Sequence, residues 1–156
     1  MKRILFFSLC VCFMGCIKEY NSVYTATLIN TTSHSIKILF YKGGTVLPTD
    51  TITLVQNQQF EFANGSQRGN LTNPGFSSKY FGNSNDSIVV IFDNLYKITH
   101  YGFTPLQLAP KYYLYVSPRN IGNPNSYRFV STPISSHGNK NDHYYDFKEQ
   151  DYLDAK

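Results

Sequence analysis

The chain has 156 residues, a formal net charge of +4 and 15% charged residues. No run of Lys and Arg occurs after the first three residues, so the sequence lacks the basic footprint of a nucleic-acid-binding protein. The length suits a single domain with a substantial core, and we find no internal repeat, low-complexity segment or second domain.

The start of the chain has the organisation of a secretory signal peptide. Two basic residues precede an apolar run over residues 4–14. A helix needs about 20 apolar residues to cross a bilayer, so this run is too short for a permanent transmembrane anchor. Gly15 stands directly before Cys16, and residues 13–16 (FMGC) have the form of a bacterial lipobox. The sequence therefore predicts cleavage after residue 15.

Of the three cysteines, Cys10, Cys12 and Cys16, only Cys16 follows a small residue, as lipobox processing requires. We expect its thiol to carry a diacylglyceryl group, so that fatty chains such as palmitate hold the protein on a membrane. One acyl chain anchors a protein marginally, whereas two hold it stably. With Cys10 and Cys12 in the leader, no disulfide is expected. The alternative is an ordinary signal peptide in which Cys16 is incidental.

The residues after Cys16 bear on location. Ile17, and not an Asp, follows the cysteine, which under the sorting rule of enteric bacteria favours the outer membrane. The pair Lys18-Glu19 resembles a short form of the charged tag that sends some Bacteroidetes lipoproteins to the cell surface. We therefore predict an outer-membrane protein on the periplasmic or surface-exposed face, with residues 1–15 removed, 16–22 as a lipidated tether and 23–156 as one β-rich domain.

The composition after the leader favours β-structure. The chain has 13 Tyr and 12 Phe but no Trp, and it is rich in Asn, Thr and Ser. Residues 149–155 are expected to form one or two helical turns, with Glu149 and Asp151 well placed for the N-terminal dipole. Alternating or β-branched segments predict strands over residues 23–30, 35–42, 50–56, 59–63, 87–92, 96–101, 112–116, 127–130 and 143–147.

Turn residues separate these segments. Residues 30–34 predict a turn that joins the first two strands in a hairpin, and Asp93-Asn94 predicts left-handed backbone and a second hairpin. The β-branched run 87–92 is expected to be a central strand covered on both faces. Further turns or loops are expected at residues 64–70, 73–75, 120–125 and 135–142. About seven to nine short strands without an amphipathic helix predict an all-β antiparallel sandwich or small barrel with a short C-terminal helical turn.

Three stretches carry a resemblance to other proteins. They are the pattern Ile29-Asn30-x-Thr32-x-His34-x-Ile36-x-Ile38, residues 87–93 (SIVVIFD) and residues 145–152 (YDFKEQDY). Together they resemble uncharacterised small lipoproteins of the Bacteroidetes, over most of the chain after the leader. The resemblance implies a lipid-anchored, β-rich protein and brings no known activity.

No catalytic or cofactor-binding motif is present. The segment 65–69 (GSQRG) lacks the G-x-S-x-G spacing of a nucleophile elbow, and no P-loop or dinucleotide fingerprint occurs, so we expect no cofactor. Imidazole and carboxylate groups bind zinc, but the candidates match no helical His pair, and solvated loop side chains are the alternative. His34 or His100 could join such a site, although His100 is expected to make a structural cross-strand hydrogen bond. The candidate metal ligands are His137, Asp142, His143 and Asp146.

Tyrosine side chains offer a second kind of site. Tyr112, Tyr113 and Tyr115 could present flat faces to a sugar or a peptide, and residues 144–152 add further tyrosines. The alternative is that these rings fill the core, as large aromatic residues do in small β-domains.

The sequence as a whole predicts a non-catalytic, lipid-anchored β-domain that binds an envelope protein or a glycan. Two alternatives remain open. One is a metal-dependent hydrolase that uses the His/Asp cluster near residues 137–146, and the other is a structural accessory subunit of an outer-membrane complex.

Overall fold

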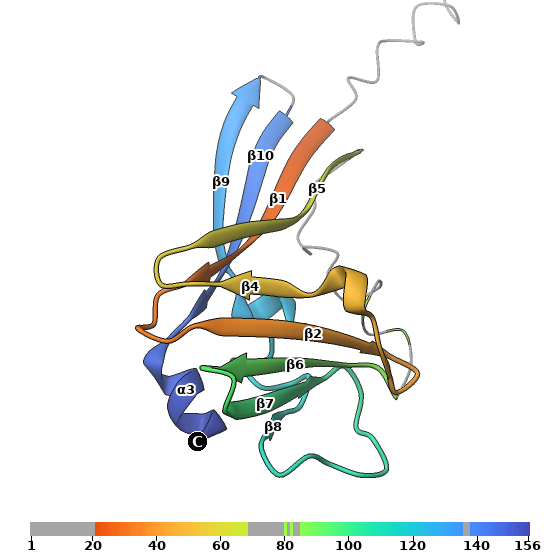
Figure 1. Cartoon of the computed structure of the whole chain (residues 1–156). Helices are drawn as coiled ribbons and strands as arrows, with labels where there is room; N and C mark the ends of the chain where they lie inside the picture. The colour runs from red at the N-terminus through yellow and green to blue at the C-terminus, as the bar shows by residue number, and fades with distance from the viewer. Residues whose placement is uncertain (1–20, 69–79, 81, 83–84, 136–137) are drawn as a thin grey trace, which may run out of the picture.

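A computed structural model describes residues 21–68, 80, 82, 85–135 and 138–156. Within these ranges ten strands form two sheets (Figure 1). The four-stranded sheet has the order β5 (Gln59–Arg68), β1 (Asn21–Asn30), β10 (Gly138–Phe147) and β9 (Arg128–Ser135). The six-stranded sheet has the order β3 (Thr45–Val46), β2 (Ile36–Lys42), β6 (Ser87–Phe92), β7 (Tyr96–Tyr101) and β8 (Tyr112–Tyr113), and β4 (Ile52–Leu54) also pairs with β2. Short 3-10 helices η1 (Pro48–Asp50) and η2 (Pro124–Ser126) lie in connections, and helix α3 (Glu149–Ala155) follows β10.

This architecture confirms the all-β, sandwich-like fold with a short C-terminal helix. Most strand pairs are antiparallel, but β1–β10 and β7–β8 are parallel. β1 and β10 come from opposite ends of the described chain and lie side by side in the middle of their sheet (Figure 1). The domain is therefore closed by the pairing of its first and last strands.

The hydrophobic core lies between the two sheets. The four-stranded sheet contributes Leu28, Tyr145 and Phe147, all fully buried. Burying such a side chain stabilises the fold by roughly 1.5–3 kcal/mol. From the six-stranded sheet, side chains of β2 and β6 stand opposite each other in the ladder and face the same core, as the pairs Ile36–Phe92, Ile38–Val90 and Phe40–Ile88.

β6 and β7 form the hairpin expected from the sequence. Asp93 (φ 51°) and Asn94 (φ 57°) turn the chain in the left-handed conformation that short polar side chains tolerate. β6 is central in its sheet, as expected, but its second face, with Val89 and Ile91, is only half-buried.

The turn after β1 does not form the expected hairpin. β1 pairs with β5 and β10, whereas β2 pairs with β3, β4 and β6, so the chain crosses from one sheet to the other. The buried amide of Asn30 donates to the carbonyls of His34 (2.7 Å) and Leu54 (3.2 Å). Its oxygen accepts from the N–H (3.0 Å) and the hydroxyl (2.8 Å) of Thr32. The expectation was wrong because alternation shows which face a strand buries and not which strand lies beside it.

Two segments expected to be loops are strands. Residues 64–68 of the loop expected at 64–70 lie inside β5, and residues 138–142 form the first half of β10. In β10 the side chain of Asn141 is satisfied across the ladder, since the hydroxyl of Ser131 on β9 donates to its Oδ1 at 2.8 Å. Polar composition alone therefore misplaced the start of the last strand.

Other boundaries also differ from expectation. A strand was expected over 112–116 but β8 has only two residues, whereas β9 runs well beyond the expected 127–130. The turns expected at residues 69–70 and 73–75 lie outside the described residues. Within the described ranges, no helix is long and apolar enough to cross a bilayer.

Helix α3 forms over the expected residues and is fixed by a mostly buried ion pair. Asp151 is 2% exposed and accepts the N–H of Lys148 at 2.8 Å, which caps the helix although the Lys148 side chain has no acceptor. Arg119 donates to both carboxylate oxygens of Asp151, from Nε at 2.9 Å and from Nη2. Nη2 also donates to the carbonyl of Asp146 at 2.9 Å, and the guanidinium lies 5.0 Å from the ring centre of Tyr145.

Replacing Asp151 by Ala is expected to lower the free energy of unfolding by about 3 to 5 kcal/mol, because it leaves the Arg119 guanidinium mostly buried without its counter-charge. Urea unfolding followed by circular dichroism measures the change. Gln150→Ala, on the exposed side of the same helix, is the matched control and should cost about 0.5 kcal/mol or less. Equal losses in the two variants would contradict the role of the pair.

Candidate functional site

The candidate metal ligands on β10 are not brought together. Side chains alternate along a strand, so His143 points into the sandwich while Asp142 and Asp146 point to the opposite face. The Asp142 carboxylate accepts the Thr25 hydroxyl at 2.5 Å and lies 3.1 Å from the Lys140 ammonium. Within the described ranges, no group of three His, Cys, Asp or Glu side chains is arranged to hold a metal ion, and His137 lies outside these ranges.

His143 instead lies at a pocket of about 300 Å³ between η2 and β9. Burial lowers the pKa of its imidazole, and Nε2 has no hydrogen-bond partner among the described residues. The ring of Phe129 covers the imidazole at a centre-to-centre distance of 5.0 Å. A neutral histidine under an aromatic ring fits a structural role at this position.

His34 connects the crossing between the sheets to α3. Its Nδ1 lies 2.5 Å from a carboxylate oxygen of Asp93, and its Nε2 lies 3.4 Å from Glu149. The ring stacks on Tyr152 at 3.6 Å. Hydrogen bonds from His34 and Ser35 hold the pKa of Asp93 below its usual value, and the Ser33 amide does the same for Glu149. Each ring nitrogen thus lies beside a carboxylate from a different part of the fold, Asp93 in the β6–β7 turn and Glu149 in α3. His34 therefore has a structural role, because it connects these two parts.

His100 is structural, as expected, but its partner is not on a neighbouring strand. Nδ1 accepts the N–H of Ile121 at 2.9 Å, so the proton of the neutral ring resides on Nε2. The ring meets that of Tyr113 edge-on at 5.2 Å. Burial lowers the pKa of His100 to about 3, and the charge of Arg119 acts in the same direction.

The three candidate tyrosines do not form a common platform. Tyr112 and Tyr113 are neighbours on β8 and therefore point to opposite faces. The Tyr113 hydroxyl donates to Asp154 of α3, and Tyr112 lies beside Tyr101 with ring centres 6.4 Å apart. Tyr115 lies beyond β8 and is half-buried. Tyr113 is occupied in holding the helix, so only Tyr112 keeps an exposed ring.

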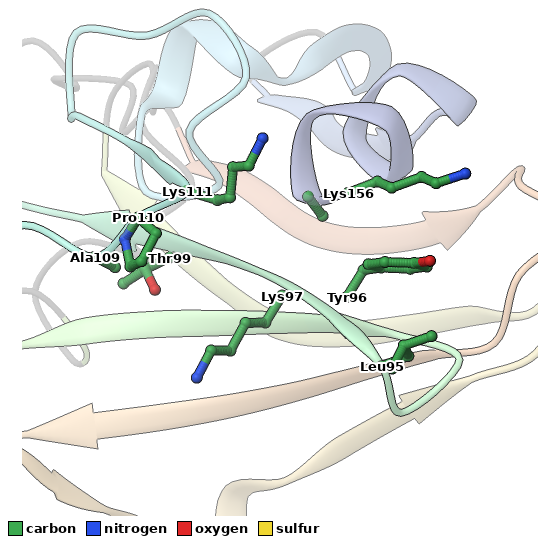
Figure 2. Close-up of a pocket in the computed structure, with 9 residues that line it drawn as sticks. Leu95, Tyr96, Lys97, Thr99, Ala109, Pro110, Lys111 and Lys156 are labelled. Atoms are coloured by element: carbon green, nitrogen blue, oxygen red, sulfur yellow. The ribbon is translucent and has the colours of Figure 1, made fainter.

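A site that sequence reasoning missed lies at the edge of β7. A pocket of about 190 Å³ opens there between the end of α3 and the segment before β8 (Figure 2). The described residues that line it are Leu95, Tyr96, Lys97, Thr99, Ala109, Pro110, Lys111, Ala155 and Lys156.

The pocket exists because β8 is short. β8 pairs only with Thr99 and His100, so the preceding part of β7 has β6 on one side and no described strand on the other. The Thr99 N–H bonds to the carbonyl of Lys111, the last residue before β8, at 3.0 Å. The chain that precedes Lys111 does not pair with β7. The end of β7 nearest Tyr96 is therefore an open sheet edge.

Three lysines surround this open edge. Lys156 lies with Nζ 5.9 Å from the ring centre of Tyr96, on the side of the sheet where α3 packs. Figure 2 shows Lys111 on that side too and Lys97 pointing to the other. None of the three ammonium groups has an ion-pair partner within the described part of the chain. The site therefore offers positive charge and main-chain groups, which suits binding.

No sequence signal marks this site. Lys97, Lys111 and Lys156 are isolated basic residues in three separate segments, and only the fold brings them together. Comparison of the chain with known protein families, with curated proteins and with solved structures finds no match.

The buried His100 predicts a pH dependence of stability. Its pKa is about 3 in the folded protein and about 6.5 in an unfolded chain, so between these values the unfolded state binds the additional proton. Stability should therefore fall as the pH is lowered from 6.5, by about 1.4 kcal/mol per pH unit for this group. Urea unfolding between about pH 7 and pH 5.5 measures the slope where ordinary carboxylates are still almost fully ionised.

His100→Asn is the test variant, because an Asn side-chain oxygen can accept the Ile121 N–H without titrating. The variant should lose less stability on acidification than the wild type. His143, whose pKa is also lowered, contributes equally to both proteins. Parallel slopes would show that His100 is not the responsible group.

Proposed function

We propose that this protein is a lipid-anchored, non-catalytic binding domain of the bacterial outer membrane. The observation that carries the proposal is the lipobox at residues 13–16, in which Gly15 precedes Cys16. An acylated Cys16 would bring two fatty chains, the number that holds a protein stably on a bilayer.

The anchor would orient the domain. β1 begins at Asn21, and an extended chain spans at most about 3.6 Å per residue, so β1 would start within roughly 18 Å of the lipidated Cys16. β1 starts at the end of the four-stranded sheet that points away from α3 (Figure 1). The open edge of β7, next to α3, would then face away from the membrane and toward soluble or surface-bound partners.

A binding role is supported by the way the polar groups are used. The imidazoles of His34 and His100 and the carboxylates of Asp93 and Asp151 bond to neighbouring elements of the fold. The pocket at the β7 edge presents cations and main-chain groups, with no paired nucleophile and base among the described residues that line it. An envelope protein is thus a more suitable partner for this edge than a reacting substrate.

A second candidate function is a structural accessory subunit of an outer-membrane complex. It is favoured by the connection between β7 and β8, where Phe103, Leu106 and Leu108 are all exposed. Apolar side chains gathered in one exposed connection mark a protein contact more often than scattered ones do.

Cys16→Ser tests the anchor. The variant should move from the membrane fraction to the soluble fraction, because it lacks the thiol that receives the lipid. Cys12→Ser, which removes a neighbouring leader cysteine, is the control and should leave the protein in the membrane fraction. Mass spectrometry of the wild type should show an acylated Cys16 at the N-terminus. A bare thiol there, or unchanged fractionation of Cys16→Ser, would refute the anchor.

A further inference from the structure

We propose that the open edge of β7 binds an extended, acidic segment of a partner protein, which adds to the six-stranded sheet as a short strand. The inference deepens the proposed binding function and rests on it only for where the edge faces. Recognition would combine main-chain hydrogen bonds to β7 with charge pairing to the three lysines.

Every second residue of β7 points its main-chain N–H and C=O groups away from β6, as strand addition requires. The Thr99 N–H bonds to the Lys111 carbonyl, and the Tyr101 carbonyl accepts from the Asn120 side chain at 2.9 Å. Both groups therefore point away from β6. Peptide groups of a strand repeat their direction every second residue, so the N–H and C=O of Lys97 point to the same side. β8 does not reach this position, so within the described part of the chain no strand bonds to the Lys97 peptide groups, and they are open to an incoming strand.

The side chains around the edge determine what strand would fit. Tyr96 and Lys97 are neighbours on β7 and point to opposite faces of the sheet. Lys156 lies near the Tyr96 ring and Lys111 stands on the same side, whereas Lys97 stands on the other (Figure 2). Positive charge therefore flanks the open edge on both faces.

An added strand also points successive side chains to opposite faces. Acidic residues at consecutive positions would each reach an ammonium group, one from Lys97 and the next from Lys111 or Lys156. A basic segment would be repelled at both faces, and a neutral one would gain only the main-chain bonds. The complementary partner is therefore an extended segment with adjacent Asp or Glu residues.

A simpler interpretation is that the lysines protect the edge. Lysine on an exposed edge strand discourages pairing with other chains, and a short open edge is a common way to limit aggregation. On this interpretation the site attracts acidic peptides through charge alone, without a defined strand. The two interpretations differ in whether the ligand must be extended and whether the Lys97 amide becomes protected.

The test uses the full chain as its purified Cys16→Ser form, whichever fraction contains it, and short capped peptides. The first peptide contains pairs of adjacent Glu residues separated by Val. The second replaces each Glu with Lys, and the third is the acidic peptide with a central Pro. The acidic peptide should bind and slow hydrogen exchange at the Lys97 amide. The basic and the proline-containing peptides should not, because one has the wrong charge and the other cannot complete a strand.

Lys111→Glu should weaken binding of the acidic peptide about fivefold, since one charge pair is lost and a repulsion replaces it. Lys42→Glu is the matched control with the same change in net charge, because Lys42 is exposed at the far end of β2 from this edge. Equal effects of the two variants would overturn the proposal. So would equal binding of the proline-containing peptide, or an unchanged Lys97 exchange rate. Binding by the unlipidated chain is independent of the anchor, so failure of one proposal leaves the other to its own test.

Discussion

The ion pair between Arg119 and Asp151 is the constraint on which the arrangement of α3 depends. The carboxylate caps the helix at Lys148, and the guanidinium bonds to the end of β10. Arg119 itself lies in the connection that follows β8, and its main-chain carbonyl accepts the Tyr145 hydroxyl of β10 at 2.7 Å. A single buried contact thus ties the helix, the last strand and the connection that follows β8. Without the ion pair, a charged group would remain mostly buried with no counter-charge beside it.

Fixing α3 also shapes the edge of β7. The Tyr152 ring stands edge-on to Tyr96 at 5.5 Å and stacks on His34, so the helix covers the end of β7 from one side. Tyr113 of β8 donates to Asp154, which holds β8 against the helix. The helix and the segment before β8 therefore form two walls of the pocket, and the open edge lies between them. The site follows from how the fold is closed rather than from a separate binding motif.

The sequence predicted where the strands and the helix lie along the chain better than it predicted which strands pair with each other. Alternation in 36–42 and the β-branched run 87–92 located two central strands, and the acidic residues of 149–155 located the helix. Alternation carries no information about pairing, so the crossing at Asn30 was mistaken for a hairpin. The polar composition of residues 138–142 predicts a loop, because their burial depends on a partner strand far along the chain, β1, from which Thr25 donates to Asp142.

The candidate site could not be predicted for the same reason. Taken one at a time, the three lysines are ordinary surface residues. They form a site only because β8 is too short to pair with the part of β7 beside them. Conversely, the clustered His and Asp residues of the last strand looked like ligands in sequence, yet a strand turns neighbours to opposite faces. His100 was correctly expected to be structural, but its partner is the Ile121 amide, which belongs to a connection whose path no local pattern specifies.

Strand addition at β7 requires that the Lys97 N–H has no hydrogen-bond partner in the free protein, and amide exchange reports this directly. Residue-resolved exchange should show protected amides at Ile98, whose N–H faces β6, and at Thr99, whose N–H bonds to Lys111, with rapid exchange at the preceding residue, Lys97. Protection of the Lys97 amide equal to that of Ile98 would mean that the edge is already occupied, and would contradict the account.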